Sequence, residues 1–319
     1  MNINEEKDTR PIMVSIRCTA YNHEKYIRDA LEGFVMQKTN FRFEAIVHDD
    51  ASTDGTAAII REYAEKYPDI IKPIYETENQ YSKHDGSLRR IMTEACVGKY
   101  IALCEGDDYW TDPYKLQKQV DFMEKHPDCS LTYHACKNVF DDVEGYTFGE
   151  TVKESYTSVS LLNDYFQTAT IVVRRDVFTS ELYKKAVQTG CLSGDTLLCL
   201  TASKYGKLMG VNEQMSVYRR HSSGLSQHME NGEKIYNNYK AWIAVSMLFG
   251  RDVKRWLEEH RLKMYIVKAF MLKDFLLLIK LIRYGIMKVP YSVFLATMQI
   301  LNYCFNRIIR FDFVHKHSF

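Results

Sequence analysis

The sequence predicts an α/β fold, in which a central sheet is flanked by helices, followed by a C-terminal helical extension. Short apolar stretches rich in β-branched residues alternate with stretches of helical periodicity over about 135 residues. Two acidic clusters, HDDASTD (48–54) and CEGDD (104–108), overlap the ends of two predicted strands. From about residue 233 onward, the pattern is helical and rich in aromatic and aliphatic residues. Alternation of strand and helix is typical of a parallel sheet whose strands are joined by helices.

Each element follows from a local pattern. Asn22 is predicted to cap the first helix and Asp112 a later one, which would begin at Pro113. Residues 141–155 are predicted to form a long loop. The predicted strands are 12–18, 43–49, 70–75, 99–105, 129–136 and 169–175, and 207–221 is predicted to be a strand or a hairpin. We place the domain boundary after residue 232, giving a catalytic domain over 1–232 and a helical extension over 233–319.

Composition limits the class of protein. The chain has 319 residues and a net charge of +1, so it is not a polycation built to bind nucleic acid. From Arg251 onward it holds 13 Lys/Arg and 5 Asp/Glu, a net charge of about +8. None of the eight cysteines forms a C-x-x-C pair, which indicates reduced core thiols. With no apolar secretory segment at the N-terminus, we expect a cytoplasmic protein, either free or peripheral on the inner face of the cell membrane.

The acidic cluster LCEGDDYW (103–110) raises a chemical question, because adjacent carboxylates repel each other. Asp107 and Asp108 follow a predicted strand on a short glycine-bearing loop. Ligands of α/β sheets bind outside the carboxyl ends of the strands, so both acidic clusters are expected to face one crevice. Carboxylate oxygens suit Mg²⁺ or Mn²⁺, which take further ligands from phosphate. The alternative is a helix cap followed by a solvated turn.

Three stretches together carry a resemblance. TAYNHEKYI, DDASTDGT and GKYIALCEGDDYW, in this order and spacing, resemble the inverting family 2 glycosyltransferases with a GT-A fold, over about residues 10–225. The resemblance implies a Rossmann-like mixed sheet flanked by helices. It also implies metal-dependent transfer of a hexosyl or N-acetylhexosaminyl group from a nucleotide-sugar donor, with UDP the most frequent nucleotide. The acceptor would be a hydroxyl group of a saccharide or of a lipid-linked acceptor, in the biosynthesis of cell-surface polysaccharide or glycolipid.

The resemblance assigns roles to the nucleotide site. Tyr21 matches the aromatic residue that stacks on the base, and Thr19 lines the same pocket. Asp50 matches the carboxylate that accepts the imide N–H of the base, a role that suits an acceptor-only group. Arg89 would meet the diphosphate or ribose, and Asp107 the ribose or the metal.

The remaining roles concern the metal and the reacting groups. Asp108 would bind the metal together with His221, and Arg219 and Arg220 would stabilise the diphosphate. Asp195 matches the general base, which takes the proton of the acceptor hydroxyl. Gly194 stands before it where the family often has Glu, and a helix N-cap is the alternative.

Other acidic and basic side chains near these motifs have structural explanations. Asp54 is expected to cap a helix, and His23 to be a solvated residue before a helix.

Lys268, Lys273, Lys280 and Arg283 interrupt apolar runs in the C-terminal extension. This pattern suits an amphipathic helix on an anionic membrane. Packing on the catalytic domain, or on another copy in a homo-oligomer, is the alternative.

Two other functions compete with transfer. A sugar nucleotidyltransferase is disfavoured because TAYNHEKYI contains no glycine, whereas an inactive sugar-binding homologue would have no need of Asp50, Asp107, Asp108 and Asp195 together.

Overall fold

The structure is a computed structural model. It describes residues 8–83, 85–140, 143–148, 156, 160–163, 166–191, 193–221, 232–271, 275–288 and 293–300. The chain divides into two compact units. Unit 1 comprises residues 1–188 and 193–222, and unit 2 comprises residues 189–192 and 223–319.

Unit 1 is built on a nine-stranded mixed sheet in the order β3-β2-β1-β4-β8-β6-β9-β5, with β7 paired to β6. Its first half is parallel: β1 pairs with β2 and β4, and β2 pairs with β3. Its second half is antiparallel at β4–β8, β8–β6 and β9–β5, while β6 and β9 run parallel. The predicted α/β architecture with a mixed sheet is therefore confirmed. The strands are β1 (Ile12–Ala20), β2 (Arg42–Asp49), β3 (Ile71–Tyr75), β4 (Tyr100–Leu103), β5 (Tyr109–Trp110), β6 (Cys129–Phe140), β7 (Val143–Phe148), β8 (Val172–Arg174) and β9 (Lys207–Arg220).

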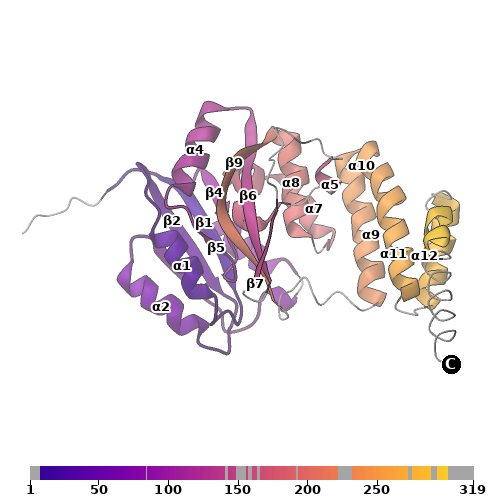
Figure 1. Ribbon diagram of the computed structural model, residues 1–319, viewed down its shortest axis with the longest axis horizontal. Helices are drawn as coiled ribbons and strands as arrows, with labels where there is room; N and C mark the ends of the chain where they lie inside the picture. Colours follow the sequence, from indigo (N-terminus) through magenta and orange to yellow (C-terminus); the bar gives the residue numbers. More distant parts are fainter. Residues whose placement is uncertain are drawn as a thin grey trace, which may run out of the picture. The chain divides into compact units, whose positions relative to one another are not determined.

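Helices pack on this sheet through apolar faces. Helix α1 (Ile27–Val35) buries Ile27, Leu31 and Phe34, the spacing expected for one helical face. Helices α1 and α2 lie side by side next to β1 and β2 (Figure 1). The other helices of unit 1 are α2 (Thr56–Lys66), α3 (Ser87–Ala95), α4 (Lys115–Lys125), α5 (Ser160–Asn163), α6 (Arg175–Phe178), α7 (Glu181–Gln188) and α8 (Gly194–Tyr205), with short 3₁₀ turns at Tyr81–Lys83 and Thr168–Thr170.

Three local predictions were wrong. Asn22 does not cap α1: it has φ 55°, and its side-chain oxygen accepts the Thr53 N–H (2.8 Å), which ties two loops together. Helix α4 begins at Lys115, two residues later than predicted, because Asp112 Oδ1 accepts the N–H of Tyr114 (2.7 Å) in the preceding turn. The predicted loop over 141–155 contains strand β7, which pairs with β6; residues 149–155 lie outside the described residues.

Unit 2 is helical, as the sequence predicts for this part of the chain. Tyr239, Leu262, Ile266, Leu277 and Leu281 form part of its buried core. Of the helices that the structure describes, none is both long enough and apolar enough to cross a membrane. The helices are α9 (Gly232–Phe249), α10 (Arg251–Trp256), a π-helical turn (Leu257–Arg261), α11 (Leu262–Met271), α12 (Phe275–Lys288) and a final helical segment over 293–300 (Figure 1).

Candidate active site

The loop after β4 is tied to the carboxyl end of β1. The Thr19 hydroxyl donates to Glu105 Oε2, and the Gly106 N–H donates to the Thr19 carbonyl (2.9 Å). Arg17 lies 3.4 Å from the other oxygen of Glu105. Two neighbouring parallel strands thus hold one loop at the edge where α/β sheets bind their ligands.

Gly106 lets this loop approach helix α1 closely. A Cβ at this position would lie 2.9 Å from both Ala20 Cβ and His23 Nδ1, and 3.0 Å from Ile27 Cδ1. Real Cβ atoms rarely come so close to other atoms, so glycine is required for the observed path of the loop. The two residues that follow, Asp107 and Asp108, are placed by this contact.

Asp108 is a buried carboxylate, with 1% of the residue exposed. Its Oδ1 accepts the backbone N–H of Arg219 (2.9 Å), a residue 111 positions further along the chain. Burial, followed by the charge of Asp107, raises the pKa of Asp108 well above its ordinary value. The N–H and the charge of Arg219 favour the ionised form, but they do not offset burial and the charge of Asp107.

Asp107 lies between two histidines. Its Oδ2 is 3.1 Å from His221 Nε2 and 3.9 Å from His23 Nε2. Burial alone would raise the pKa of Asp107, but the hydrogen bond to His221 and the charge of His23 outweigh burial and lower the pKa below its ordinary value. Asp107 and Asp108 are therefore neighbours with opposite pKa shifts, an arrangement that clusters at functional sites.

Arg219, at the end of β9, contacts the same loop. Its guanidinium group donates to the Asp107 carbonyl (3.2 Å) and to the Asp29 carboxylate. The Arg219 Cζ atom lies 5.4 Å from the centroid of the Tyr26 ring and 4.3 Å from that of the Tyr109 ring. Its guanidinium thus binds the protein itself, and its predicted role toward a diphosphate stays a prediction.

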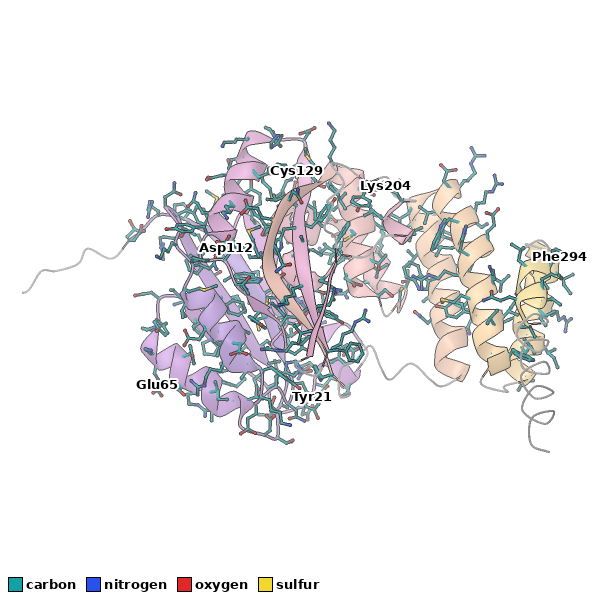
Figure 2. The ribbon with its side chains drawn as sticks, viewed as in Figure 1. Tyr21, Glu65, Asp112, Cys129, Lys204 and Phe294 are labelled. Atoms are coloured by element: carbon teal, nitrogen blue, oxygen red, sulfur yellow. The ribbon has the colours of Figure 1, made fainter. Side chains whose placement is uncertain are left out.

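The predicted nucleotide residues lie around the ends of β1 and β2. Tyr21 is exposed, as stacking on a base requires (Figure 2). Asp50 is buried and accepts the backbone N–H groups of Gln80 (2.6 Å) and Tyr81 (3.0 Å), while its own N–H donates to Ala20 O (2.9 Å). The two carboxylate oxygens still have lone pairs for a further donor.

Arg89 and Asp195 are brought together by helix α8. The Arg89 Nη2 atom lies 2.7 Å from the position that a Cβ of Gly194 would occupy, and its guanidinium lies 5.2 Å from the Tyr183 ring. Asp195 is in the first turn of α8, where its Oδ1 accepts the N–H of Thr196 (2.7 Å). Gly194, where the resemblance favours Glu, thus makes room for Arg89.

The predicted residues therefore form two groups in unit 1. Asp107, Asp108, Arg219 and His221 are joined by direct contacts, and Thr19 is joined to the same loop through Glu105. Within the part of the chain that the structure describes, no hydrogen bond or ion pair joins Arg89 or Asp195 to this group. Arg220 is exposed at the last residue of β9. Asp54 is not the N-cap of α2, which is Gly55; its Oδ1 accepts the N–H of Thr56 (3.0 Å) from one residue before the cap.

Some residues around the site were not assigned from the sequence. His23, expected to be solvated, lies close to Asp107, and its Nδ1 is buried and without a hydrogen-bond partner among the described residues. Glu105 belongs to the acidic cluster 104–108, and this was the signal in the sequence that could have placed it at the site. The fold brings Arg219 into contact with Asp29, Tyr26 and Tyr109. No local sequence pattern predicts these three contacts.

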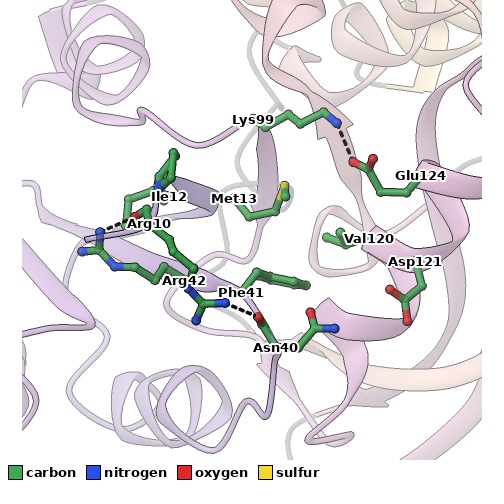
Figure 3. Close-up of a pocket in the computed structure, with 11 residues that line it drawn as sticks. Arg10, Ile12, Met13, Asn40, Phe41, Arg42, Lys99, Val120, Asp121 and Glu124 are labelled. Carbon is green, nitrogen blue, oxygen red and sulfur yellow. Dashed lines mark hydrogen bonds and ion pairs between the residues drawn. The ribbon is translucent and has the colours of Figure 1, made fainter. Parts of the chain in front are cut away.

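The opposite end of the parallel strands carries a hollow of about 580 Å³. Its charged side chains already have partners: Arg10 binds Asp8, Arg42 binds the Arg10 carbonyl, and Lys99 binds Glu124 (2.6 Å; Figure 3). Asp121 accepts a hydrogen bond from Gln117 (2.8 Å). Each of these charged side chains thus has a hydrogen-bond or ion-pair partner within the protein.

Comparisons with known proteins identify the class. Glycosyl transferase family 2 matches residues 15–179, which include both acidic clusters, so the chain belongs to this family.

The chain is also similar to individual family members and structures. It is 37% identical over 215 residues to the uncharacterized protein Rv1520 of Mycobacterium tuberculosis, covering 66% of this chain and 60% of the relative. It is 28% identical over 233 residues to the putative teichuronic acid biosynthesis glycosyltransferase TuaG of Bacillus subtilis, covering 72% of this chain and 86% of TuaG.

Two solved structures support the fold. S. aureus TarS 1–349 in complex with UDP-GlcNAc has a TM-score of 0.64 at 18% identity, with 88% of this chain and 83% of TarS covered. The mannosyltransferase PcManGT of Pyrobaculum calidifontis, in complex with GDP-Man and Mn²⁺, has a TM-score of 0.54 at 15% identity, with 92% and 81% covered. The GT-A fold predicted from the sequence is confirmed.

Proposed function

We propose that the protein is a metal-dependent inverting glycosyltransferase. It would move a sugar, hexosyl or N-acetylhexosaminyl, from a nucleoside diphosphate sugar to a hydroxyl acceptor. The observation that carries this proposal is the adjacent pair of half-buried Asp107 and buried Asp108, held at the carboxyl ends of β1 and β4 and linked to the end of β9. Family membership supports the same chemistry.

The side chains present fit a divalent cation shared with a diphosphate. Among the described residues, no group of three or more His, Cys, Asp or Glu side chains is arranged to hold a metal ion. This is compatible with Mg²⁺ or Mn²⁺ bound through one or two carboxylates and substrate phosphates. Asp108, with His221 and Asp107 beside it, would hold the ion. Because burial and Asp107 disfavour the ionised form of Asp108, a cation bound there would stabilise it. When bound, the metal would offset negative charge on the departing diphosphate.

Asp195 is proposed as the general base. It would take the proton of the acceptor hydroxyl as that oxygen bonds to the anomeric carbon. The bond from this carbon to the diphosphate oxygen breaks, and the nucleoside diphosphate leaves with the electron pair. Attack from the opposite face inverts the anomeric centre. Arg89 of α3, which lies against Gly194 at the start of α8, has a buried Nη1 with no partner among the described residues, which suits a contact with the diphosphate.

We further infer that the donor carries uracil, bound by Tyr21, Thr19 and Asp50. Exposure of the Tyr21 ring and the remaining lone pairs of Asp50 support this assignment. The name of the similar protein TuaG supports a saccharide or lipid-linked acceptor in cell-surface polysaccharide synthesis. The described cysteines are free and buried, which supports a cytoplasmic location.

A thermal-shift panel with UDP, GDP, dTDP and CMP, each with Mn²⁺, tests the site. UDP should give the largest shift, and Asp108→Asn should abolish it. Asp121→Asn, at the opposite end of the strands, is the matched control and should keep the shift. An equal response to all four nucleotides would contradict the proposed donor.

Reaction products separate transfer from its alternatives. With a UDP-sugar and Mn²⁺ but no acceptor, slow release of UDP is expected, as water replaces the acceptor. Asp195→Asn should keep the UDP shift and lose transfer. Release of pyrophosphate from a nucleoside triphosphate and a sugar phosphate would instead identify a nucleotidyltransferase.

A further inference from the structure

Helix α12 exposes a face that combines apolar and basic side chains. Its sequence, FLLLIKLIRYGIMK, contains three basic residues and no acidic residue. Leu277 and Leu281 are buried in the core of unit 2. On the other side Leu276, Ile279 and Ile286 are 66%, 62% and 60% exposed.

The exposed side chains form one continuous stripe. At about 100° per residue, Leu276, Ile279, Arg283 and Ile286 fall within an arc of about 80°. Lys280 and Arg283 are also exposed and lie along the same stripe. Leu277 and Leu281 fall on the opposite arc, so the geometry of the helix separates its two faces.

We propose that this face of α12, defined by Leu276, Ile279, Lys280, Arg283 and Ile286, binds the surface of an anionic lipid bilayer. The helix would lie in the plane of the interface, with aliphatic groups among the acyl chains and basic groups at the lipid phosphates. Long basic side chains can bury their stems while the charge stays in water. Since no described helix is long and apolar enough to cross a membrane, surface binding is the geometry that the helix offers.

Charge and size favour a bilayer over a second protein chain. Lysine is depleted in the buried centre of protein interfaces, whereas exposed Lys280 directly borders this stripe, about 40° from Leu276. From Leu276 to Ile286 the stripe is about 15 Å long and about 10 Å wide, or roughly 150 Å². A standard protein interface buries about 800 Å² on each partner.

Sedimentation of the full chain with vesicles tests the proposal. Wild type should sediment with phosphatidylcholine vesicles that contain phosphatidylglycerol and remain in solution with pure phosphatidylcholine. The double variant Ile279→Glu/Ile286→Glu should bind the anionic vesicles at least about tenfold more weakly. Met247→Glu, on α9 of the same unit and 69% exposed in the wild type, is the matched control and should bind like wild type.

Several results would overturn the proposal. These are no binding of the wild type to anionic vesicles, binding by the double variant equal to wild type, or an equal loss in Met247→Glu. A wild-type dimer that the double variant converts to a monomer would assign the face to a second copy instead. If the double variant does not fold, Ile279→Ser and Arg283→Gln should each weaken binding, and retention in both would contradict the proposal.

This inference makes the proposed membrane location specific, but it is tested without nucleotide, metal or turnover. Vesicle binding with no release of UDP would contradict the transferase and leave the surface intact. UDP release without vesicle binding would contradict the membrane-binding face and leave the transferase intact.

Discussion

The two ends of the parallel strands in unit 1 differ in how their charges are balanced. At the amino ends, Arg10, Lys99, Asp121 and Glu124 each have a partner, and Figure 3 shows the ion pair between Lys99 and Glu124. At the carboxyl ends, Asp108 is buried beside Asp107 with its pKa raised well above the ordinary value. One end of the sheet therefore carries charged side chains that have partners, and the other carries a buried carboxylate whose ionised form is disfavoured.

The presence or absence of partners distinguishes charged residues with a structural role from those with a functional role. The number of charged residues at each end does not. Both ends hold several acidic and basic residues, and both contain aromatic or aliphatic side chains. Desolvation without a matching cation destabilises the folded state, and such strain is retained where a ligand supplies the missing charge. The comparison predicts opposite responses to substitution at the two ends.

The largest effect is expected from neutralising one carboxylate at each end. Asp108→Asn should lower the rate of sugar transfer by about 10³-fold or more, because the metal loses its ligand. The melting temperature should stay equal or rise, since repulsion from Asp107 is removed. Glu124→Gln should leave transfer unchanged and alter stability by about 0.5 kcal/mol or less. Steady-state kinetics measures transfer, and calorimetry measures stability. An equal loss of activity in the two variants would show that the two ends of the sheet do not differ in function.

An intermediate effect is expected from the glycines that flank β4. A Cβ at Gly98 would lie 2.4 Å from Ser15 N, so Gly98→Ala should lower the free energy of unfolding by about 2–3 kcal/mol. A Cβ at Gly106 would meet the fixed Cβ of Ala20 and two side chains that can shift, His23 and Ile27, so Gly106→Ala should lower the free energy of unfolding by about 1–2 kcal/mol. It should nonetheless lower transfer by about 10²-fold, because it displaces Asp107 and Asp108.

Urea unfolding and kinetics on the same preparations separate these two outcomes. Folded Gly98→Ala should keep its turnover number. A Gly106→Ala variant with wild-type turnover would show that the loop tolerates movement, contrary to the geometry described.

The smallest effect concerns Lys115, a fully buried lysine whose Nζ donates to Gln119 (2.7 Å) and lies 4.1 Å from the centroid of the Trp110 ring. Burial lowers the pKa of Lys115 to about 7. Between about pH 7 and pH 10.5, Lys115 therefore carries a proton in the unfolded chain but not in the folded chain. Because the unfolded state binds more protons, the free energy of unfolding should rise with pH in this window.

Lys115→Met should remove about 1.5 kcal/mol of the rise in unfolding free energy between about pH 7 and pH 8.5. Lys125→Met, exposed at the last residue of the same helix, is the control and should keep the wild-type slope. A slope in Lys115→Met identical to wild type would show that this lysine is protonated in the fold.

The fold was predictable where local pattern decides it. Strands β1, β2 and β4 are short apolar runs and were placed to within a few residues. Strand β5 has two residues, and β7 contains a glycine, so neither has a pattern of its own. Asn22 was misassigned because a left-handed turn and a helix cap favour the same residue type.

The site was predictable in its carboxylates but not in what surrounds them. Asp107 and Asp108 stand out as adjacent acids after a strand. The approach of Asp29, Tyr26 and Tyr109 to Arg219 depends on how β9 crosses the sheet, which a single sequence does not encode locally.

The bond from Arg219 to Asp108 spans 111 positions, and it has a consequence for how the protein matures. The segment that matches the family ends at residue 179, before β9 has begun. A nascent chain or a trimmed fragment of that length would hold its acidic loop without the strand that closes it. Competence for chemistry would then arise late in synthesis, once the ribosome has released residue 221, and not when the recognisable motifs first emerge.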